Sequence, residues 1–447
     1  MLDRIQIFLA IGVLLGSLIL TFRGALGVNR RLAVVDIGVW WLAFLAIYSI
    51  QPVLYWLVTG EYLSVATNRL ELLRTSSSDF AEVVGISAWY AVAFVPAYFM
   101  MRPSRVQDIS IARIGNDVLF PTVCLCILAW LSIRMLFPDL HSGTGYESKF
   151  LNLSQESLGA RRIHKFALAF LIISDLILIV AFLQRRELRK WVLIWLPALV
   201  LLVNPGSSRG AVALLLIVFL ISWHALVRPI PRIVWMLAAL GGILAFNLLG
   251  AVRSYGYLPS TSEIFPWLIA SGEFEHIFGN AVELRQAVRQ GLDVPQTARF
   301  AELFAFVPSE YFSFDKTTLA DWFMETFHPE LKATGGGLAF GIMGQAVIGL
   351  GAIEAIVRGF IFGILLGLVS NYMLKNASRH WWVFPAYIYL LTRTFDSVRS
   401  TMFGSVSDLL QIFVPLIVLL CCASALLRAL PEMKAGGDLR GARNELS

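Results

Sequence analysis

Charged residues are scarce in this chain, and their scarcity excludes most classes of soluble protein. Only 15% of the 447 residues are charged and 57% are hydrophobic, and the mean hydropathy is +0.72. A typical soluble domain carries about a quarter charged residues. The composition therefore predicts a polytopic membrane protein.

Cysteines and the common catalytic motifs are also few or missing. The four cysteines all lie inside apolar runs, so we expect neither a disulfide framework nor a metal site. The sequence has no Walker loop, no His-Glu-x-x-His helix and no Asp-x-Asp motif. We therefore expect no nucleotide donor, no metal and no other cofactor.

Long apolar runs, by contrast, recur along the whole chain. A spanning helix needs about 20 apolar residues, and eleven runs approach that length. The run from Ile5 to Phe22 lacks a cleavage site, so we expect a retained helix. The predicted fold class is an all-α polytopic membrane protein with about 11 transmembrane helices. The runs are 5–22, 34–58, 80–101, 118–137, 166–183, 191–203, 211–227, 233–250, 350–374, 381–394 and 405–427.

The basic residues predict the orientation of these spans. One alternate set of loops carries 18 Lys and Arg against 6 acidic residues, whereas the other carries 16 against 19. Because basic loops stay in the cytoplasm, the N-terminus should be periplasmic and the C-terminus cytoplasmic, in a bacterial inner membrane. No basic patch with interleaved aromatics is present, so the net charge of +6 does not indicate a nucleic-acid partner.

This topology divides the chain into four parts. Residues 1–250 form a bundle of the first eight spans, and residues 251–337 form a large periplasmic loop with helix-like stretches, notably 277–291. Residues 338–430 hold the last three spans after a Gly-rich stretch too short to span, which we interpret as re-entrant. Residues 431–447 form a polar cytoplasmic tail.

Arginines on the predicted outer side need an explanation that topology does not give. Arg209 follows the helix-breaking sequence Asn-Pro-Gly-Ser-Ser between two spans, Arg253 closes the span 233–250, and Arg399 follows the span 381–394. A guanidinium is costly in hydrocarbon but is suited to bidentate contacts with phosphate oxygens. We therefore expect Arg209, Arg253 and Arg399 to bind a phosphate or a pyrophosphate in an outward-facing cavity.

For the other charged residues on the predicted outer side, the sequence gives weaker evidence of a function. Snorkelling or a pair with Glu354 accounts for Arg358 better than a catalytic role does. For Arg393 and Arg399, a structural ion pair with Asp396 is as good an account as a function. The periplasmic loop also offers several possible general bases, of which His276 with its neighbour Glu273 is the leading candidate. The candidates are Glu273, Glu275, His276, Glu310, Asp315, Asp321 and His328.

A family resemblance combines these features. About eleven spans, the sequence Ser-Ser-Arg-Gly-Ala at 207–211, Arg253 opening a large outer loop, and the Gly-rich segment 335–367 after it resemble the Wzy O-antigen polymerases. The resemblance rests on the arrangement over most of the chain more than on identity.

The resemblance implies a metal-independent membrane glycosyltransferase of the GT-C type. Such an enzyme transfers a growing glycan from undecaprenyl pyrophosphate to the next lipid-linked repeat unit at the periplasmic face. Its partners would be the lipid-linked donor and acceptor, the bilayer and a chain-length regulator. Arg209 and Arg253 would hold the donor pyrophosphate, and Arg399 matches the family more weakly.

Three alternatives stay open at this point. An O-antigen ligase, which passes the finished glycan to lipid A core, shares the outer arginine and the large outer loop. A flippase or secondary transporter of lipid-linked sugars also uses broken helices, although no inverted repeat is visible in the sequence. A purely structural membrane protein would leave the outer arginines without a role.

Overall fold

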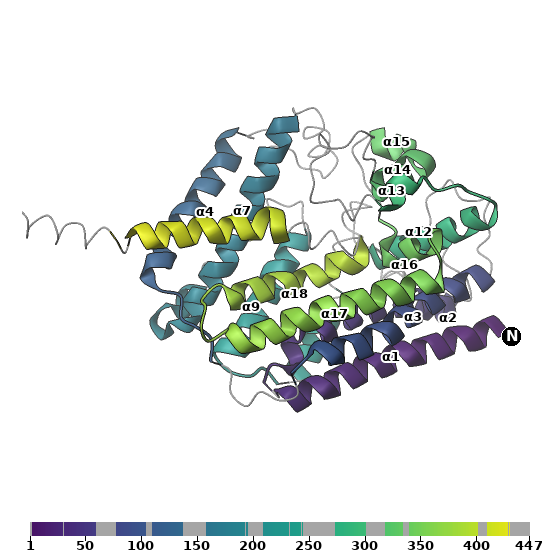
Figure 1. Ribbon diagram of the computed structural model, residues 1–447, viewed down its shortest axis with the longest axis horizontal. Coiled ribbons are helices and arrows are strands. Elements are labelled where there is room, and N and C mark those ends of the chain that lie inside the picture. The colour runs from purple at the N-terminus through teal and green to yellow at the C-terminus, as the bar shows by residue number, and fades with distance from the viewer. Residues whose placement is uncertain are drawn as a thin grey trace, which may run out of the picture. The chain divides into compact units, whose positions relative to one another are not determined.

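A computed structural model describes most of the predicted membrane core. It covers residues 2–29, 31–59, 77–103, 110–136, 158–192, 194, 209–231, 233–242, 244, 273–300, 318–333, 339–400, 409–427 and 429. Every regular element within these ranges is helical (Figure 1). Two compact units are present: unit 1 comprises Met1–Ser110, Trp223–Ala377 and Tyr387–Ser407, and unit 2 comprises Ile111–Ser222, Ser378–Ala386 and Asp408–Ser447.

Seven of the described helices are long and apolar enough to cross a membrane. This confirms a helical, polytopic, membrane-embedded protein, whereas the total of about 11 spans and the GT-C arrangement stay predictions. Two further apolar helices, Leu215–Leu226 and Ile233–Gly242, are shorter within the described residues. The seven are Leu2–Val28, Ile37–Val58, Ser77–Met101, Asn116–Leu136, Phe166–Gln184, Ala352–Asn376 and Leu410–Leu427.

The core of unit 1 is a bundle of α1 (Leu2–Val28), α2 (Ile37–Thr59), α3 (Ser77–Met101) and α17 (Ala352–Asn376). The Ser77 hydroxyl at the start of α3 donates to Asp3 at the start of α1, over 2.6 Å. These two helices therefore run in the same direction. Large aromatic rings fill the bundle, which gives the core close packing over a wide apolar area.

Glycines on α17 allow it to approach α3 unusually closely. A Cβ atom added at Gly363 would lie 2.6 Å from the backbone oxygen of Phe94, and one added at Gly359 would lie 2.6 Å from that of Tyr90. Gly367, one turn further on, faces the Tyr98 oxygen at 2.9 Å in the same way. The two helices pack backbone against backbone, in parallel, as small residues allow in membranes.

Replacing Gly363 with alanine should therefore destabilise the bundle. The new methyl group meets backbone rather than a flexible side chain, so α17 must move away from α3, at a cost of about 1–3 kcal/mol. Thermal unfolding in detergent should show a lower midpoint for Gly363→Ala than for wild type. Gly16→Ala on α1 is the control, because nothing lies within 4 Å of that position. Equal midpoints for the two variants would contradict this packing.

Helix α18 (Val383–Arg399) runs beside this bundle in the opposite direction to α17. We expected the span to end at Arg393, which was wrong, because the helix continues to Arg399. The Arg393 guanidinium pairs with Asp396 over 2.6 Å within the same helix. The charge of Arg393 is thus neutralised within the helix, so it does not end the helix at that position.

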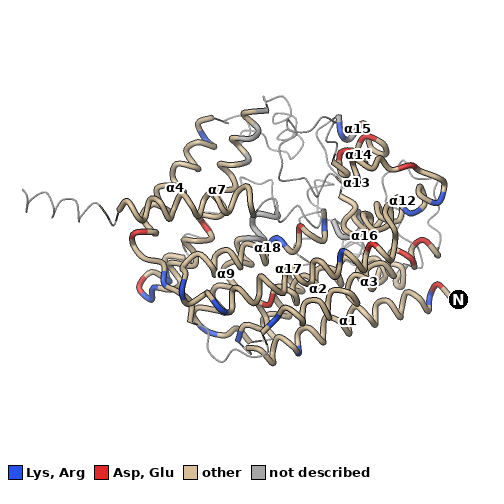
Figure 2. The backbone as a smooth tube through the Cα atoms, in the orientation of Figure 1, with Lys and Arg blue, Asp and Glu red and all other residues tan. Residues whose placement is uncertain are grey.

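Shorter helices of unit 1 lie within the predicted loop 251–337 or directly after it. They are α12 (Glu273–Arg289), α13 (Gln296–Phe300), α14 (Leu319–Phe327), α15 (Pro329–Ala333) and α16 (Gly341–Ile348). Figure 2 shows the acidic positions of α12, α14 and α15. α16 is buried along its whole length and is too short to span a membrane. The helix expected at 277–291 is present as α12, which packs against α2, α3 and α16.

Unit 2 is built on α4 (Asn116–Leu136) and α7 (Leu158–Gln184). Cys126 lies in a cluster of buried apolar residues between these helices, and its thiol donates to the buried Asp175 carboxylate over 3.2 Å. All four cysteines are free thiols. The helix α9 (Arg209–Leu226) begins in this unit.

Candidate functional site

The predicted site residues are described to different extents. Arg209 is the first residue of α9, Glu273 is the first residue of α12, and His276 lies in the first turn of α12. The side chains of these three residues lie outside the described part of the chain. Arg253 lies outside it altogether. Arg399 is the last residue of α18 and is partly buried.

The structure brings two of these regions together around one glycine. Gly341, the first residue of α16, has a φ of 63°, which favours glycine. A Cβ atom there would lie 2.8 Å from the Ile277 side chain and 3.6 Å from the Arg399 carbonyl oxygen. The end of α18 that carries Arg399 therefore meets the start of α12, next to His276.

A buried polar face of α12 continues from this meeting point. Asn280 and Glu283 follow His276 at helical spacing, so the three positions share one side of the helix. The Asn280 amide donates to the Ala339 carbonyl over 2.8 Å. The Glu283 Oε2 lies 3.8 Å from His328 Nε2, at the C-terminal cap of α14. Burial raises the pKa of Glu283 to about 7.

Sequence reasoning did not single out Glu283 or Asn280. A carboxylate in a long polar loop is usually solvated, and His328 was one of several possible bases. The sequence feature that could have indicated them is the helical spacing of His276, Asn280 and Glu283, at the start of the helix expected at 277–291. Their burial depends on α14 and α16, which come from distant parts of the sequence.

The opposite side of α12 is fixed to α3 by ion pairs. The Arg285 Nε lies 2.8 Å from Glu82 Oε2, and Arg289 pairs with both Glu82 and Asp79. These contacts fix the orientation of α12 about its own axis. The face with Asn280 and Glu283 is consequently directed away from α3.

The remaining described arginines near this end of α17 have structural partners. Glu354 pairs with Arg358 over 2.7 Å on the same helix and with Arg299 over 2.7 Å from α13 (Gln296–Phe300). The expected pair of Arg358 with Glu354 is thus confirmed. These ion pairs account for Arg358 and Arg299 without a role in phosphate binding.

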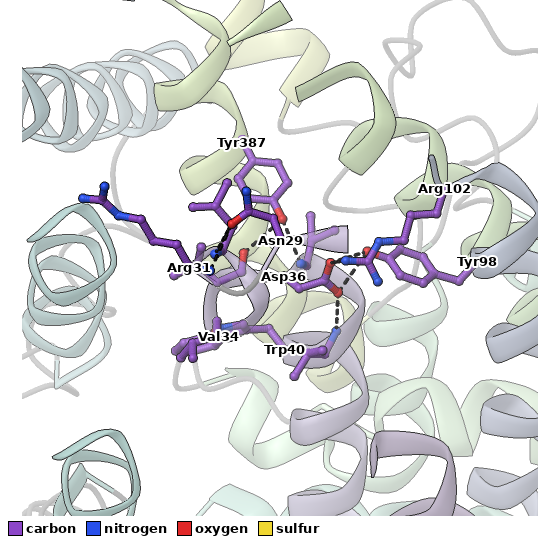
Figure 3. A network of polar contacts seen from close by, with 12 residues as sticks. Asn29, Arg31, Val34, Asp36, Trp40, Tyr98, Arg102 and Tyr387 are labelled. Carbon is purple, nitrogen blue, oxygen red and sulfur yellow. Dashed lines mark hydrogen bonds and ion pairs between the residues drawn. The ribbon is translucent and has the colours of Figure 1, made fainter. Parts of the chain in front are cut away.

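A second polar cluster lies at the other end of the unit 1 bundle (Figure 3). The Tyr98 hydroxyl donates to both carboxylate oxygens of Asp36 over 3.0 and 2.9 Å, and Arg102 Nη2 lies 2.8 Å from Asp36 Oδ2. The Tyr387 hydroxyl donates to the Val35 carbonyl and accepts from the Ile37 amide. This cluster joins α2, α3 and α18 where the predicted topology places the cytoplasm, and we interpret it as structural.

Comparison with known proteins gives no evidence for a particular function. Among the described residues, no group of three or more His, Cys, Asp or Glu is placed to hold a metal ion. No protein-family model, no curated protein and no solved structure matches the chain. The functional conclusion therefore depends on the residues and their geometry alone.

Proposed function

We propose that this chain is a membrane glycosyltransferase that polymerises lipid-linked oligosaccharide repeat units. It transfers the growing glycan from undecaprenyl pyrophosphate to the next lipid-linked unit at the outer face of the membrane. Arg209, Arg253 and Arg399 hold the pyrophosphate and stabilise the charge that develops on it as the glycan leaves. No metal is needed for this role, because guanidinium groups supply the positive charge.

The observation that carries this proposal is the meeting of α12, α16 and α18 at Gly341. It places a predicted pyrophosphate ligand, Arg399, beside the helix that carries the predicted proton acceptors. A polymerase needs both groups within reach of one reacting sugar. A flippase requires no proton acceptor next to the phosphate site, so this juxtaposition favours an enzyme.

The direct test is elongation by the purified protein. Full-length protein in detergent, given lipid-linked repeat units as the only substrate, should convert them into a ladder of longer lipid-linked chains. Gel separation of the products measures the length. Failure to lengthen units that another polymerase accepts would overturn the proposal.

A deletion strain separates the polymerase from the ligase. Loss of a polymerase should leave lipopolysaccharide capped with single repeat units, because ligation still proceeds. Loss of a ligase should leave no repeat unit attached. The second result would replace our assignment with an O-antigen ligase.

A further inference from the structure

The buried face of α12 contains polar oxygens that the helix packing does not satisfy. The Glu283 side chain is 7% exposed, and its Oε2 has no hydrogen-bond partner among the described residues. The Asn280 Oδ1 atom, in the same part of the structure, has none either. Buried polar oxygens are normally hydrogen-bonded, so one without a partner needs an explanation, such as a catalytic role or a bound water or ligand. This face of α12 is therefore a candidate surface for a polar ligand.

The position of this face suits the acceptor of the proposed transfer. Glu283 follows Ile277 by six residues, which corresponds to about 9 Å along the helix axis. Ile277 itself contacts Gly341 beside the end of α18. Glu283 thus lies about 9 Å along α12 from the point where this helix meets the Arg399 end of α18.

We propose that Glu283 is the general base that takes the proton from the acceptor sugar hydroxyl. This role rests on the proposed polymerase function. The hydroxyl proton passes to Glu283 as the oxygen forms a bond to the anomeric carbon of the donor glycan. The bond between that carbon and the pyrophosphate oxygen breaks, and its electron pair leaves with undecaprenyl pyrophosphate.

The surroundings of Glu283 favour a proton acceptor that works near neutral pH. Burial brings its pKa to about 7, so the carboxylate that can accept a proton forms above that pH. On α14, His328 is the only charged or titratable group among the described contacts of Glu283. From α3, the carboxylates Asp79 and Glu82 are neutralised by arginines on the opposite face of α12. The sequence of α16 has no titratable residue, and that of α2 has only tyrosines, Tyr48 and Tyr55.

The test compares wild type with Glu283→Gln and Glu283→Asp in the detergent elongation assay over a pH series. The wild-type rate should rise with pH and level off above about 7, because the base must be deprotonated. Glu283→Gln, which has almost the same shape and cannot accept the proton, should lose about 10²–10⁴-fold in rate and lose this pH dependence. Glu283→Asp should keep part of the rate.

Glu325→Gln is the matched control, because this exposed carboxylate on α14 pairs only with Lys332 among its described contacts. A second readout is the thermal stabilisation of each variant by undecaprenyl pyrophosphate. Glu283→Gln should keep the stabilisation seen with wild type, since a base does not hold the leaving group.

The outcomes separate the two proposals. Wild-type elongation rates in Glu283→Gln would overturn the role as base and leave the polymerase intact. Loss of the undecaprenyl pyrophosphate stabilisation together with activity would assign Glu283 to folding or donor binding and also overturn it. If wild type itself does not elongate competent units, both the function and this role fail.

Discussion

Arg209→Ala and Arg253→Ala should each reduce elongation by at least about 10²–10³-fold, the cost of removing one group that stabilises transition-state charge. In each case the pyrophosphate leaves with less compensation for its developing negative charge. Arg209→Lys should recover only part of the rate, because an ammonium group cannot reproduce the bidentate contact of a guanidinium. The measurement is the initial rate of chain lengthening by purified protein in detergent.

Lys332→Ala provides the control for these arginine variants. Lys332 is a cation in the predicted periplasmic loop, but it pairs with the exposed Glu325. We expect its removal to leave elongation close to wild type. All variants should insert and purify normally, because neither Arg209 nor Arg253 is expected to hold the bundle together. Activity near wild type in either arginine variant would remove that residue from the pyrophosphate site.

The membrane core of this fold could be predicted well from the sequence. Hydrocarbon thickness fixes the length of a spanning helix, so the apolar runs alone locate α2 and α17 to within a few residues. The end of α18 could not be located in this way. It depends on whether Arg393 finds a partner, and the pair with Asp396 is a property of the folded helix.

The candidate site could be predicted only in part. The outer arginines were visible because charge is unexpected at membrane level. Glu283 was not, since its chemistry comes from burial beneath α14 and α16 and not from its neighbours in the sequence. Whether Arg209 and Arg253 share a cavity with Arg399 stays a prediction, because their side chains lie outside the described residues.

The contacts that fix α12 would let this helix hold the proposed base accurately. Arg285 and Arg289 join it to α3, and the aromatic rings of Phe80 and Phe278 pack 5.0 Å apart in the same interface. A proton acceptor must stay within about 3 Å of its target. A base on a helix fixed in this way satisfies that requirement better than one on a free loop.

Arg102→Ala should destabilise the protein strongly, by about 3–5 kcal/mol, because it leaves a buried carboxylate without its cation. Asp36 and Arg102 have side chains that are only 3% and 5% exposed. Burial raises the pKa of Asp36 despite the nearby guanidinium, so the charged carboxylate depends on that partner. The measurement is the midpoint of thermal unfolding in detergent.

The double variant Asp36→Leu/Arg102→Met tests whether the destabilisation of Arg102→Ala comes from loss of the ion pair or from the buried carboxylate left without its partner. Replacing a buried ion pair with apolar groups is often close to neutral, so the double variant should unfold at a higher temperature than Arg102→Ala. Arg379→Ala is the control, since Arg379 is exposed. Its midpoint should match wild type.

If Arg102→Ala and Arg379→Ala unfolded at the same temperature, the Asp36 cluster would not hold α2 to α3.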